Sequence, residues 1–380
     1  MKRIRVIDRE FNLLADISRY ESLIYTPRWS KVGEFELRIN LHIPNTETLQ
    51  KGNLIIIGSD TKKVCLIQHR ELPLDESGKQ SEVLLIKGHT LEGVLGTRLT
   101  VPPNGSYDRL TANVETIMKR YVTNNVVSPA DPDRIIEQIE VAPTQNRGLS
   151  LFSQTRYKSL AEELESLSLV SGIGWFLRLD RANQKWIFDV EEGRDLTAGQ
   201  TENPPVIFSP TFKNLKSSQY VTSDLNLRNV AYVAGQGEGD ARRVEEVGGG
   251  SGLDRYELFV DARDIEEADE EGNPIPSYEI EIRLRDRGNQ ALSETESEVF
   301  FEAQILTTGP FKYEEDWKLG DIVTIQNKQW GLLMDARITE VKEVYQASGM
   351  VLEVVFGNSM PTLTEKIKSR LNAISGDFRK

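Results

Sequence analysis

The sequence predicts a β-rich α+β fold: two similar β-barrels, a small α+β insert between them, and a helix at the C-terminal end. Three observations support this prediction: strand patterns towards both ends of the chain, helical spacing of apolar residues in its middle, and a weak repeat of one strand pattern. At 380 residues the chain is long enough for two or three domains. The expected segments are a first barrel at 1–100, the insert at 101–204, a second barrel with a helix at 205–360, and an amphipathic helix at 361–380.

The first segment contains strand patterns. Residues 34–41 alternate polar and apolar side chains without a break, which is typical of a half-buried strand. Short apolar runs bounded by glycines or charged turns follow at 54–57, 64–67 and 83–86. These runs favour an antiparallel barrel or sandwich.

Helical spacing marks the insert. From Leu110 to Tyr121 the apolar residues fall on one helical face, with Ser106 or Asp108 as the expected cap. Residues 123–150 are rich in Asn, Pro and Asp and are expected to form a loop. A second helix with an apolar face should end at Gly172, and strands at 173–179 and 186–188 should then form a hairpin. The apolar face of that second helix consists of Leu160, Leu164 and Leu167.

Strand patterns resume in the last third of the chain. Strands are expected at 205–208 and 229–233, a mobile glycine-rich hairpin tip at 235–252, and a helix at 284–297. Further strands run to Phe356, and a terminal helix opens at Pro361. The apolar residues of this terminal helix are Leu363, Ile367 and Leu371.

The strand pattern of the first segment recurs about 268 residues later, which indicates an internal duplication. Each copy runs from a glycine turn through a strand, a second strand, a long turn and a third strand to another glycine. The copies occupy residues 51–88 and 319–357, and the intervening lengths agree to within a few residues. Two related barrels in one chain favour a quasi-symmetric assembly.

Charge and cysteine content exclude several classes of protein. A formal net charge of −13 argues against a nucleic-acid-binding surface, which needs a basic stripe to neutralise phosphates. Cys65 is the only cysteine, so no intrachain disulfide can form and a reducing compartment is expected. The basic N-terminus lacks the apolar run of a signal peptide, and no stretch approaches the ~20 apolar residues of a membrane span, so stable membrane insertion is not expected.

No metal site is predicted from the three histidines. His42, His69 and His89 all lie in the first segment, without the spacing that places two ligands on one helical face and without a cysteine cluster. Strand or surface histidines are the simpler interpretation.

Glycine motifs and acidic runs support no catalytic or cofactor site either. The strand at 230–234 leads into Gly235 and Gly237, but Asp240 stands where a dinucleotide-binding turn needs its third glycine, and Leu253 breaks a Gly-x-Ser-x-Gly elbow. The acidic run 261–271 lacks the order of a calcium loop. A set of glutamates on the second helix is interpreted as its solvated polar face: Glu162, Glu163 and Glu165. We therefore predict no catalytic, cofactor-binding or metal-binding residues, and no enzyme activity.

Four stretches resemble one known family. They are 29–37 (WSKVGEFEL), 87–95 (KGHTLEGVL) with Arg98, 229–235 (NVAYVAG) with 255–263 (RYELFVDAR), and the closing LGDIV, FG and PTL at 319–363. Together they resemble the tail-tip or baseplate hub family of long-tailed phages and prophages, which is related to the N-terminal hub part of tail-associated lysins. The resemblance covers residues 1 to about 365 and rests on structural turns and strands, so it implies a fold and carries no active-site residues.

The resemblance implies a structural role. In this family two barrels like the tail-tube subunit lie in one chain, and three chains form a six-barrel ring that caps the tube and leaves a channel for DNA. The expected partners are a homotrimer, distal tail and tail-tube proteins, the tape-measure protein, and receptor-binding or fibre proteins. The expected location is a virion tail assembled in the host cytoplasm.

Two other functions remain open from the residues. A cell-wall hydrolase of the tail-associated lysin type would need a catalytic pair that the sequence does not offer convincingly, and relatives with such activity continue into a lytic region beyond the length of this chain. A carbohydrate-binding module could use the aromatic residues Trp175, Trp186, Trp317 and Trp330, although aromatics in strands are more often core residues.

Overall fold

The first strand-rich segment forms one half of a large sheet. The computed structural model describes residues 1–72, 78, 81–268 and 272–357. All pairings in this half are antiparallel, in the order β3-β4-β7-β6-β5-β1-β2. The strands are β1 (Ile4–Ile7), β2 (Leu13–Ile17), β3 (Ser22–Thr26), β4 (Glu34–Asn40), β5 (Leu54–Ile57), β6 (Val64–Glu71) and β7 (Val83–Thr90). The predicted strand at 34–41 is confirmed as β4, whose apolar residues Phe35, Leu37 and Ile39 are buried.

The second strand-rich segment repeats this path. Its strands follow the order β15-β19-β22-β21-β20, so β15 takes the place of β3 and β20 the place of β5. Two short strands, β13 (Asp195–Leu196) and β14 (Ile207–Phe208), pair in parallel with β20. The other members are β15 (Leu215–Ser223), β19 (Glu298–Ile305), β20 (Ile322–Asn327), β21 (Leu332–Gln346) and β22 (Gly349–Gly357).

Backbone details also agree between the two halves. Gly52 and Gly320 precede β5 and β20 with φ values of 92° and 91°, a region that favours glycine. The Gly52 amide donates to the Ile67 carbonyl at 2.8 Å, and the Gly320 amide donates to the Ile338 carbonyl at 2.9 Å. A β-bulge follows directly after Ile67 and directly after Ile338. The same glycine turn and the same bulge in both halves support the predicted duplication.

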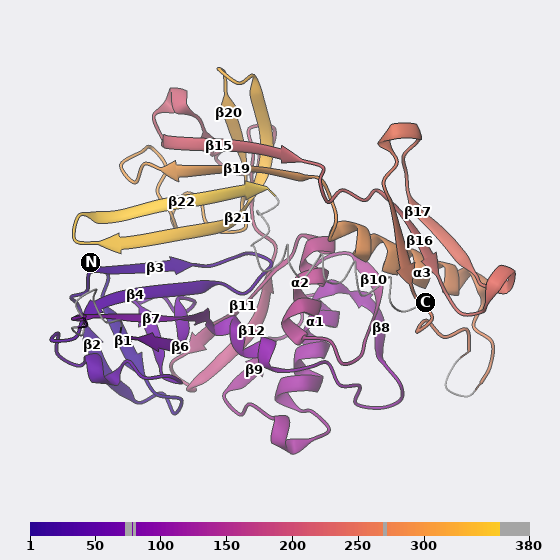
Figure 1. Cartoon of the computed structure of the whole chain (residues 1–380), viewed down its shortest axis with the longest axis horizontal. Coiled ribbons are helices and arrows are strands. Elements are labelled where there is room, and N and C mark those ends of the chain that lie inside the picture. Colours follow the sequence, from indigo (N-terminus) through magenta and orange to yellow (C-terminus); the bar gives the residue numbers. More distant parts are fainter. Residues whose placement is uncertain (73–77, 79–80, 269–271, 358–380) are drawn as a thin grey trace.

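The two halves are joined edge to edge. The last residues of β21 pair antiparallel with β3, from Glu343 opposite Tyr25 to Gln346 opposite Ser22. Figure 1 shows β21 and β22 lying directly beside β3 and β4, so the halves form one sheet of 14 strands. The structure is thus a β-rich α+β fold, as predicted. Closure of either half into a barrel stays a prediction.

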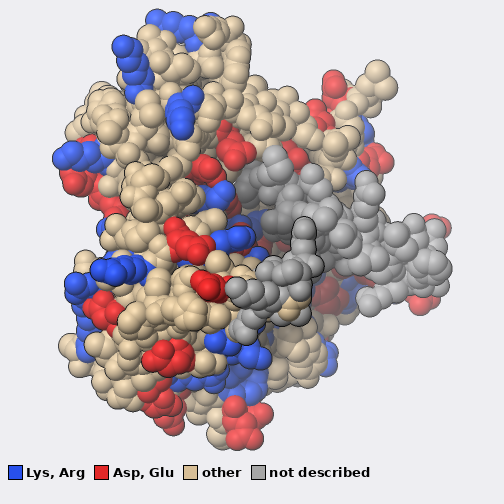
Figure 2. Space-filling view, turned by 60° about the vertical axis from the view of Figure 1, so that its left-hand side comes forward, with Lys and Arg blue, Asp and Glu red and all other residues tan. Residues whose placement is uncertain are grey.

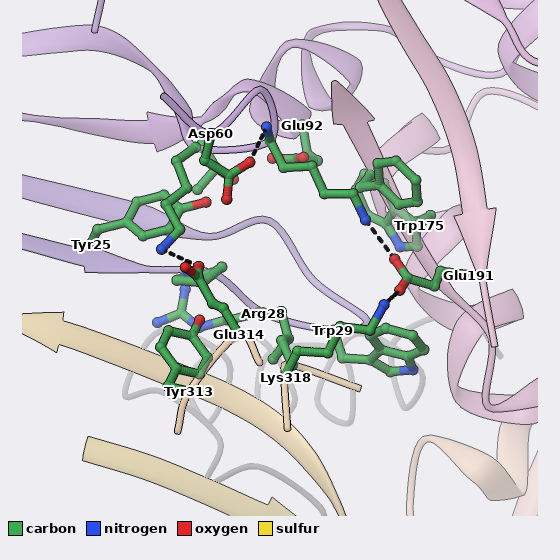
Figure 3. A pocket seen from close by; sticks show the side chains of 16 residues that line it. Tyr25, Arg28, Trp29, Asp60, Glu92, Trp175, Glu191, Tyr313, Glu314 and Lys318 are labelled. Carbon is green, nitrogen blue, oxygen red and sulfur yellow. Dashed lines mark hydrogen bonds and ion pairs between the residues drawn. The ribbon is translucent and has the colours of Figure 1, made fainter. Parts of the chain in front are cut away.

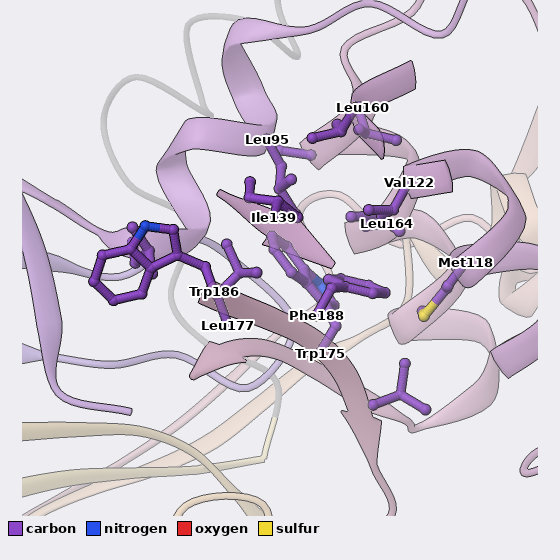
Figure 4. Close-up of a cluster of buried hydrophobic side chains, with 14 of the residues drawn as sticks. Leu95, Met118, Val122, Ile139, Leu160, Leu164, Trp175, Leu177, Trp186 and Phe188 are labelled. Carbon is purple, nitrogen blue, oxygen red and sulfur yellow. The ribbon is translucent and has the colours of Figure 1, made fainter. Parts of the chain in front are cut away.

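The insert packs two helices on a short sheet. α1 (Val114–Val122) and α2 (Leu160–Ser171) cover the hairpin of β11 (Gly174–Asp180) and β12 (Lys185–Glu191), which continues in parallel to β9 (Ile139–Val141). In Figure 4, Trp175, Leu177 and Phe188 of the hairpin lie close to Met118 and Val122 of α1 and to Leu164 of α2. The second helix and its end are confirmed, with Gly172 at φ 74° as the C-cap.

The first helix of the insert begins later than predicted. Leu110 lies in β8 (Asp108–Asn113), which pairs with β10 (Ser150–Thr155). The cap is Asn113, whose side chain accepts a hydrogen bond from the Thr116 amide at 2.9 Å, so neither Ser106 nor Asp108 has this role. Pairing with β10 keeps residues 108–113 extended, although their apolar spacing also suits a helix. The predicted loop at 123–150 contains β9, which obtains its partner only from β12.

Residues 230–293 form a further small unit within the segment expected to be the second barrel. β16 (Val230–Ala234) pairs with β17 (Val244–Gly248) and with β18 (Glu257–Asp261), and α3 (Ser277–Ser293) packs on this sheet. The prediction of a glycine-rich hairpin tip over 235–252 was wrong for residues 244–248, which form β17. The backbone groups of β17 are paired with those of β16. The mobility of the remaining glycine-rich residues stays a prediction. The helix predicted at 284–297 exists but begins at Ser277 and ends at Ser293.

The predicted terminal helix with Leu363, Ile367 and Leu371 lies outside the described residues. The segment boundaries drawn from the sequence at 100, 204 and 360 remain our proposal.

Candidate functional site

The first strand half, the insert and the second strand half meet around one pocket. It has a volume of about 300 Å³, and Figure 3 shows aromatic and charged side chains pointing into it from all three parts. Its aromatic lining includes Tyr25, Trp29, Trp175 and Tyr313. The pocket therefore lies at the junction of these parts of the chain.

One wall of the pocket is a lysine–glutamate–lysine bridge. Lys62 belongs to the first half, Glu191 ends strand β12 of the insert, and Lys318 precedes β20 of the second half. The Lys62 ammonium lies 2.6 Å from Glu191 Oε2, and Lys318 contacts Oε1 of the same carboxylate. Burial opposes the charge of Glu191, but the two lysines outweigh it and lower the pKa of this carboxyl. One carboxylate thus links three parts of the chain.

The opposite wall contains a buried ion-pair network. Lys63, which is almost fully buried, lies 2.7 Å from Glu343 Oε1 and 2.5 Å from Glu314 Oε1. The hydroxyls of Tyr313 and Tyr345 also donate to Glu343. Burial acts to lower the pKa of Lys63, yet the two glutamates raise it above its ordinary value. Because Lys63 belongs to the first half and both glutamates belong to the second, the network joins the two halves.

Glu92 is a buried carboxyl at the back of the pocket. It accepts a hydrogen bond from the Leu177 amide at 2.9 Å, and burial raises its pKa. The three lysines of the pocket, Lys62, Lys63 and Lys318, each contact a glutamate of another part of the chain. The arrangement therefore suits attachment of the parts to one another, and we assign it no chemical step.

The histidines weighed from the sequence do not come together as a metal site. His42 lies 3.9 Å from Glu82, and His69 lies 3.1 Å from Glu71, on exposed positions. His89 lies in β7 opposite Glu34. Among the residues that the structure describes, no group of His, Cys, Asp and Glu has the arrangement to hold a metal ion.

The helix-α2 glutamates differ from expectation at one position. Glu163 is buried and its carboxylate lies 2.9 Å from Lys158, so it is not on a solvated face. Glu162 is exposed, and Glu165 contacts Lys31 at 3.2 Å.

The tryptophans considered as a sugar platform are mainly core residues. Trp175, Trp186 and Trp317 are at most 5% exposed, whereas Trp330 is 50% exposed. Trp317 packs edge-on against Phe208 in the second half. A row of exposed aromatic rings, which carbohydrate stacking requires, is not formed by these four residues.

The glycine-rich stretch after β16 forms a turn held by arginine. Arg242 donates to the carbonyls of Ala234 and Gly235 and contacts Asp261 at 2.6 Å. The Gly235 amide is also paired, because it donates to the Arg243 carbonyl at 2.9 Å, whereas a dinucleotide-binding turn presents its amides to a phosphate.

Surface charge on the described part of the chain is mixed. In Figure 2, Lys and Arg alternate with Asp and Glu on the coloured surface, without a continuous basic stripe on the face shown. None of the helices in the described ranges combines the length and hydropathy that a bilayer span requires.

Neither the pocket residues Lys62, Lys63, Glu191, Glu314 and Lys318 nor Glu343, the partner of Lys63, were singled out from the sequence. The sequence did contain an indication for Glu343, because it lies two residues from Val341 and from Tyr345 in β21 and so shares their buried face. A charged residue at a buried period-two position indicates a partner across the sheet.

The fold defines a class of protein. It is the fold of phage and prophage tail proteins, and three solved structures share it over nearly their whole length. The prophage MuSo2 43 kDa tail protein from Shewanella oneidensis is 12% identical, with a TM-score of 0.54, over 93% of this chain and 98% of that one. The tail protein from Neisseria meningitidis MC58 is 12% identical, with a TM-score of 0.54, over 93% and 95%. The prophage tail protein gp18 from Listeria monocytogenes EGD-e is 11% identical, with a TM-score of 0.56, over 98% and 99%.

The family follows from the sequence itself. The family model described as Siphovirus ReqiPepy6 Gp37-like protein matches residues 3–358, so this chain belongs to that family. No curated protein matches the chain. Membership of a siphovirus family and the tail-protein fold together identify a structural protein of the phage tail, which confirms the resemblance noted from the sequence.

Proposed function

We propose that this protein is the hub of a tail tip or baseplate, in which three chains form a pseudo-sixfold ring that caps the tail tube. The observation that carries the proposal is the repeated strand path within one chain, with matching glycine turns and bulges. Three chains with two equivalent halves each present six similar units, which suits docking on a sixfold tube. We expect the halves to be related by a rotation of about 60° around the ring axis.

The net charge supports a channel through which DNA passes without binding. Three chains at −13 each carry −39, and a negative surface repels the phosphate backbone. The ring would contact distal tail and tail-tube proteins on one side, enclose or abut the tape-measure protein, and anchor receptor-binding or fibre proteins.

Native mass spectrometry of the purified full chain tests the ring. The expected species has three times the 43.0 kDa mass of one chain. A monomer at every concentration, together with absence of the protein from purified tail particles, would show that the hub proposal is wrong.

We also propose that the chain lacks hydrolytic activity, because the three lysines of the central pocket, together with Glu191 and Glu314, form ion pairs between parts of the fold. Zymography on cell walls checks this. Cleavage by the pure protein that a single substitution abolishes would instead support the lysin-type alternative.

A further inference from the structure

The two halves of the sheet differ at the outer edge of two equivalent strands, β3 and β15. β3 pairs with β4 on one side and with the end of β21 on the other. β15 occupies the same place in the second half, but it lies at the end of the sheet and pairs with β19 alone among the described strands. A nine-residue strand with an open edge presents backbone groups that another strand can pair with.

The strand registers match the two halves residue by residue. In each half we start at the residue before the bulge and follow the directly opposed residues from strand to strand, towards β3 or β15. In the first half this chain is Ile67, Gly88, Phe35 and Tyr25; in the second it is Ile338, Phe356, Phe301 and Tyr220. Tyr25 and Tyr220 therefore occupy equivalent places.

The equivalent tyrosines differ in exposure. Tyr25 is 4% exposed, beneath the end of β21, whereas Tyr220 is 37% exposed. The end of β21 lies alongside β3 and contributes to this difference, because β15 has no such neighbour among the described strands. Tyr25 also lies at the central pocket, beside Lys63. A hollow of about 650 Å³ lies at the C-terminal part of β15 and is lined by residues 221–225, Glu298 and Phe300. Leu225 at its rim is 88% exposed.

The matching strand is the end of β6. The same registers place residues 69–72 of the first half at the position of residues 340–343 in β21, the stretch that reaches β3. Beyond Leu66, β6 pairs with β7 alone among the described strands, and Gln68, His69 and Glu71 are exposed. Within the described residues each chain thus has two strand edges without a partner: the edge of β15, which is equivalent to β3, and the edge of the end of β6, which is equivalent to the end of β21.

We propose that the edge of β15 in one chain pairs antiparallel with the end of β6 in a second copy of the chain. This pairing repeats between chains the contact that β21 and β3 make within the chain, and it rests on the proposed ring. Within the chain Glu343 lies opposite Tyr25. If the same register holds between chains, Leu72 of one chain lies opposite Tyr220 of its neighbour, and Glu71 lies opposite Val221. The two edges lie on different halves, so the contact is head-to-tail and repetition can close a ring.

A disulfide between neighbouring chains tests the register. In the intrachain contact, the Val341 amide donates to the Pro27 carbonyl and the Trp29 amide to the Thr339 carbonyl. The pairs Pro27–Val341 and Trp29–Thr339 are therefore hydrogen-bonded. By alternation the next pair along, Thr26–Lys342, and its counterpart Val221–Glu71 are non-hydrogen-bonded pairs, whose Cα separation of ~4.5 Å permits a disulfide. The double variant E71C/V221C should form interchain dimers and trimers on oxidation that a reductant reverses. The native Cys65 is buried and does not compete.

Two double variants provide matched controls. T26C/K342C carries the equivalent pair within the chain and should cross-link as a monomer. E71C/Q219C displaces one cysteine by two residues along the same strand face and should give at most a tenth of the interchain product. Equal cross-linking by E71C/V221C and E71C/Q219C would overturn the proposed register.

A surface substitution tests the same contact without cysteines. Tyr220→Arg should weaken trimer formation at least tenfold, because the side chain is buried in the contact. Tyr256→Arg, at a tyrosine with the same 37% exposure in the β16–β18 unit, should leave it unchanged. A trimer that forms without the E71C/V221C cross-link and tolerates Tyr220→Arg would overturn this inference and leave the hub proposal standing. A monomer at every concentration would overturn both.

Discussion

Lys63 and Glu343 show how a buried ion pair joins the two halves of the chain. Both side chains are nearly inaccessible, at 7% and 0% exposure, and 280 residues separate them in sequence. Removing water from two charges costs several kcal/mol, which is offset only where the partners and further hydrogen bonds are well placed. Here Glu314, Tyr313 and Tyr345 complete the set.

Removal of one partner should therefore be costly. Glu343→Ala leaves the Lys63 ammonium buried beside Glu314 alone and should lower the free energy of unfolding by about 3–5 kcal/mol. Glu353→Ala removes one member of the partly exposed Lys342–Glu353 pair and should cost about 1 kcal/mol or less. Urea unfolding measures both variants. Equal losses would show that the buried pair contributes no more than a surface pair.

A second buried carboxylate predicts acid sensitivity. Burial acts against the charge of Glu115, but hydrogen bonds from Arg147 and Lys119 overcome it and hold the pKa at about 2, against an ordinary 4.5. Because the folded pKa is the lower one, this residue's contribution is complete above about pH 4.5 and is lost as the pH falls towards 2. The full contribution is ~3 kcal/mol.

Urea unfolding between pH 6 and pH 2.5 checks this dependence. The wild type should lose stability over the acid part of the range, and Glu115→Gln should lose less over the same interval. Glu137→Gln, at an exposed position, is the matched control. A Glu115→Gln variant with the wild-type pH slope would contradict the assignment.

At the scale of elements, local patterns predicted most strands and helices but not their exact limits. The alternation in β4 and the helical face and glycine end of α2 were confirmed, because each is decided by its own residues. β17 and β9 were missed, since neither has a strong apolar pattern and each is extended because a neighbouring strand pairs with it. The start of α1 was misplaced for the same reason.

Gly288 inside α3 is explained by a close approach. A Cβ atom at this position would lie 2.8 Å from the Val233 and Val247 side chains of the sheet beneath. Gly288→Ala should therefore destabilise the β16–β18 unit by ~1–3 kcal/mol, although alanine gains up to ~1 kcal/mol in helix propensity. Asn289→Ala, at the exposed neighbouring position, should be neutral or stabilising. Amide exchange in β16 and β17 measures the effect; slower exchange in Gly288→Ala would contradict the prediction.

At the scale of the whole molecule, the sheet and the central pocket hold the parts in one arrangement. β21 connects the halves by strand pairing, and Glu191 connects them to the insert through Lys62 and Lys318. The hub proposal depends on this arrangement, because six units can form a regular ring only if the two halves of each chain keep a fixed relation.

Removal of the Glu191 carboxylate should weaken the attachment of the insert to the two halves of the sheet. Glu191→Ala leaves Lys62 and Lys318 close together without the anion between them, so amides around 191–194 and 316–320 should exchange faster with solvent. Glu192→Ala, at the exposed next residue, should leave exchange unchanged. Identical exchange in the two variants would show that the bridge does not hold the parts together.

The sequence by itself determined the β-rich class and indicated the duplication, because periodicity and glycine turns are local properties of the residues. Only the tertiary structure decided that the two halves share one sheet and that the pocket between them is lined by ion pairs. Lys62, Glu191 and Lys318 lie more than a hundred residues apart, so no spacing rule relates them. Likewise the equivalence of Tyr25 and Tyr220 follows from strand registers that only the fold provides. Only the fold shows that β21 lies alongside Tyr25 and that no described strand lies alongside Tyr220 on its outer side, because this depends on which distant strand is adjacent.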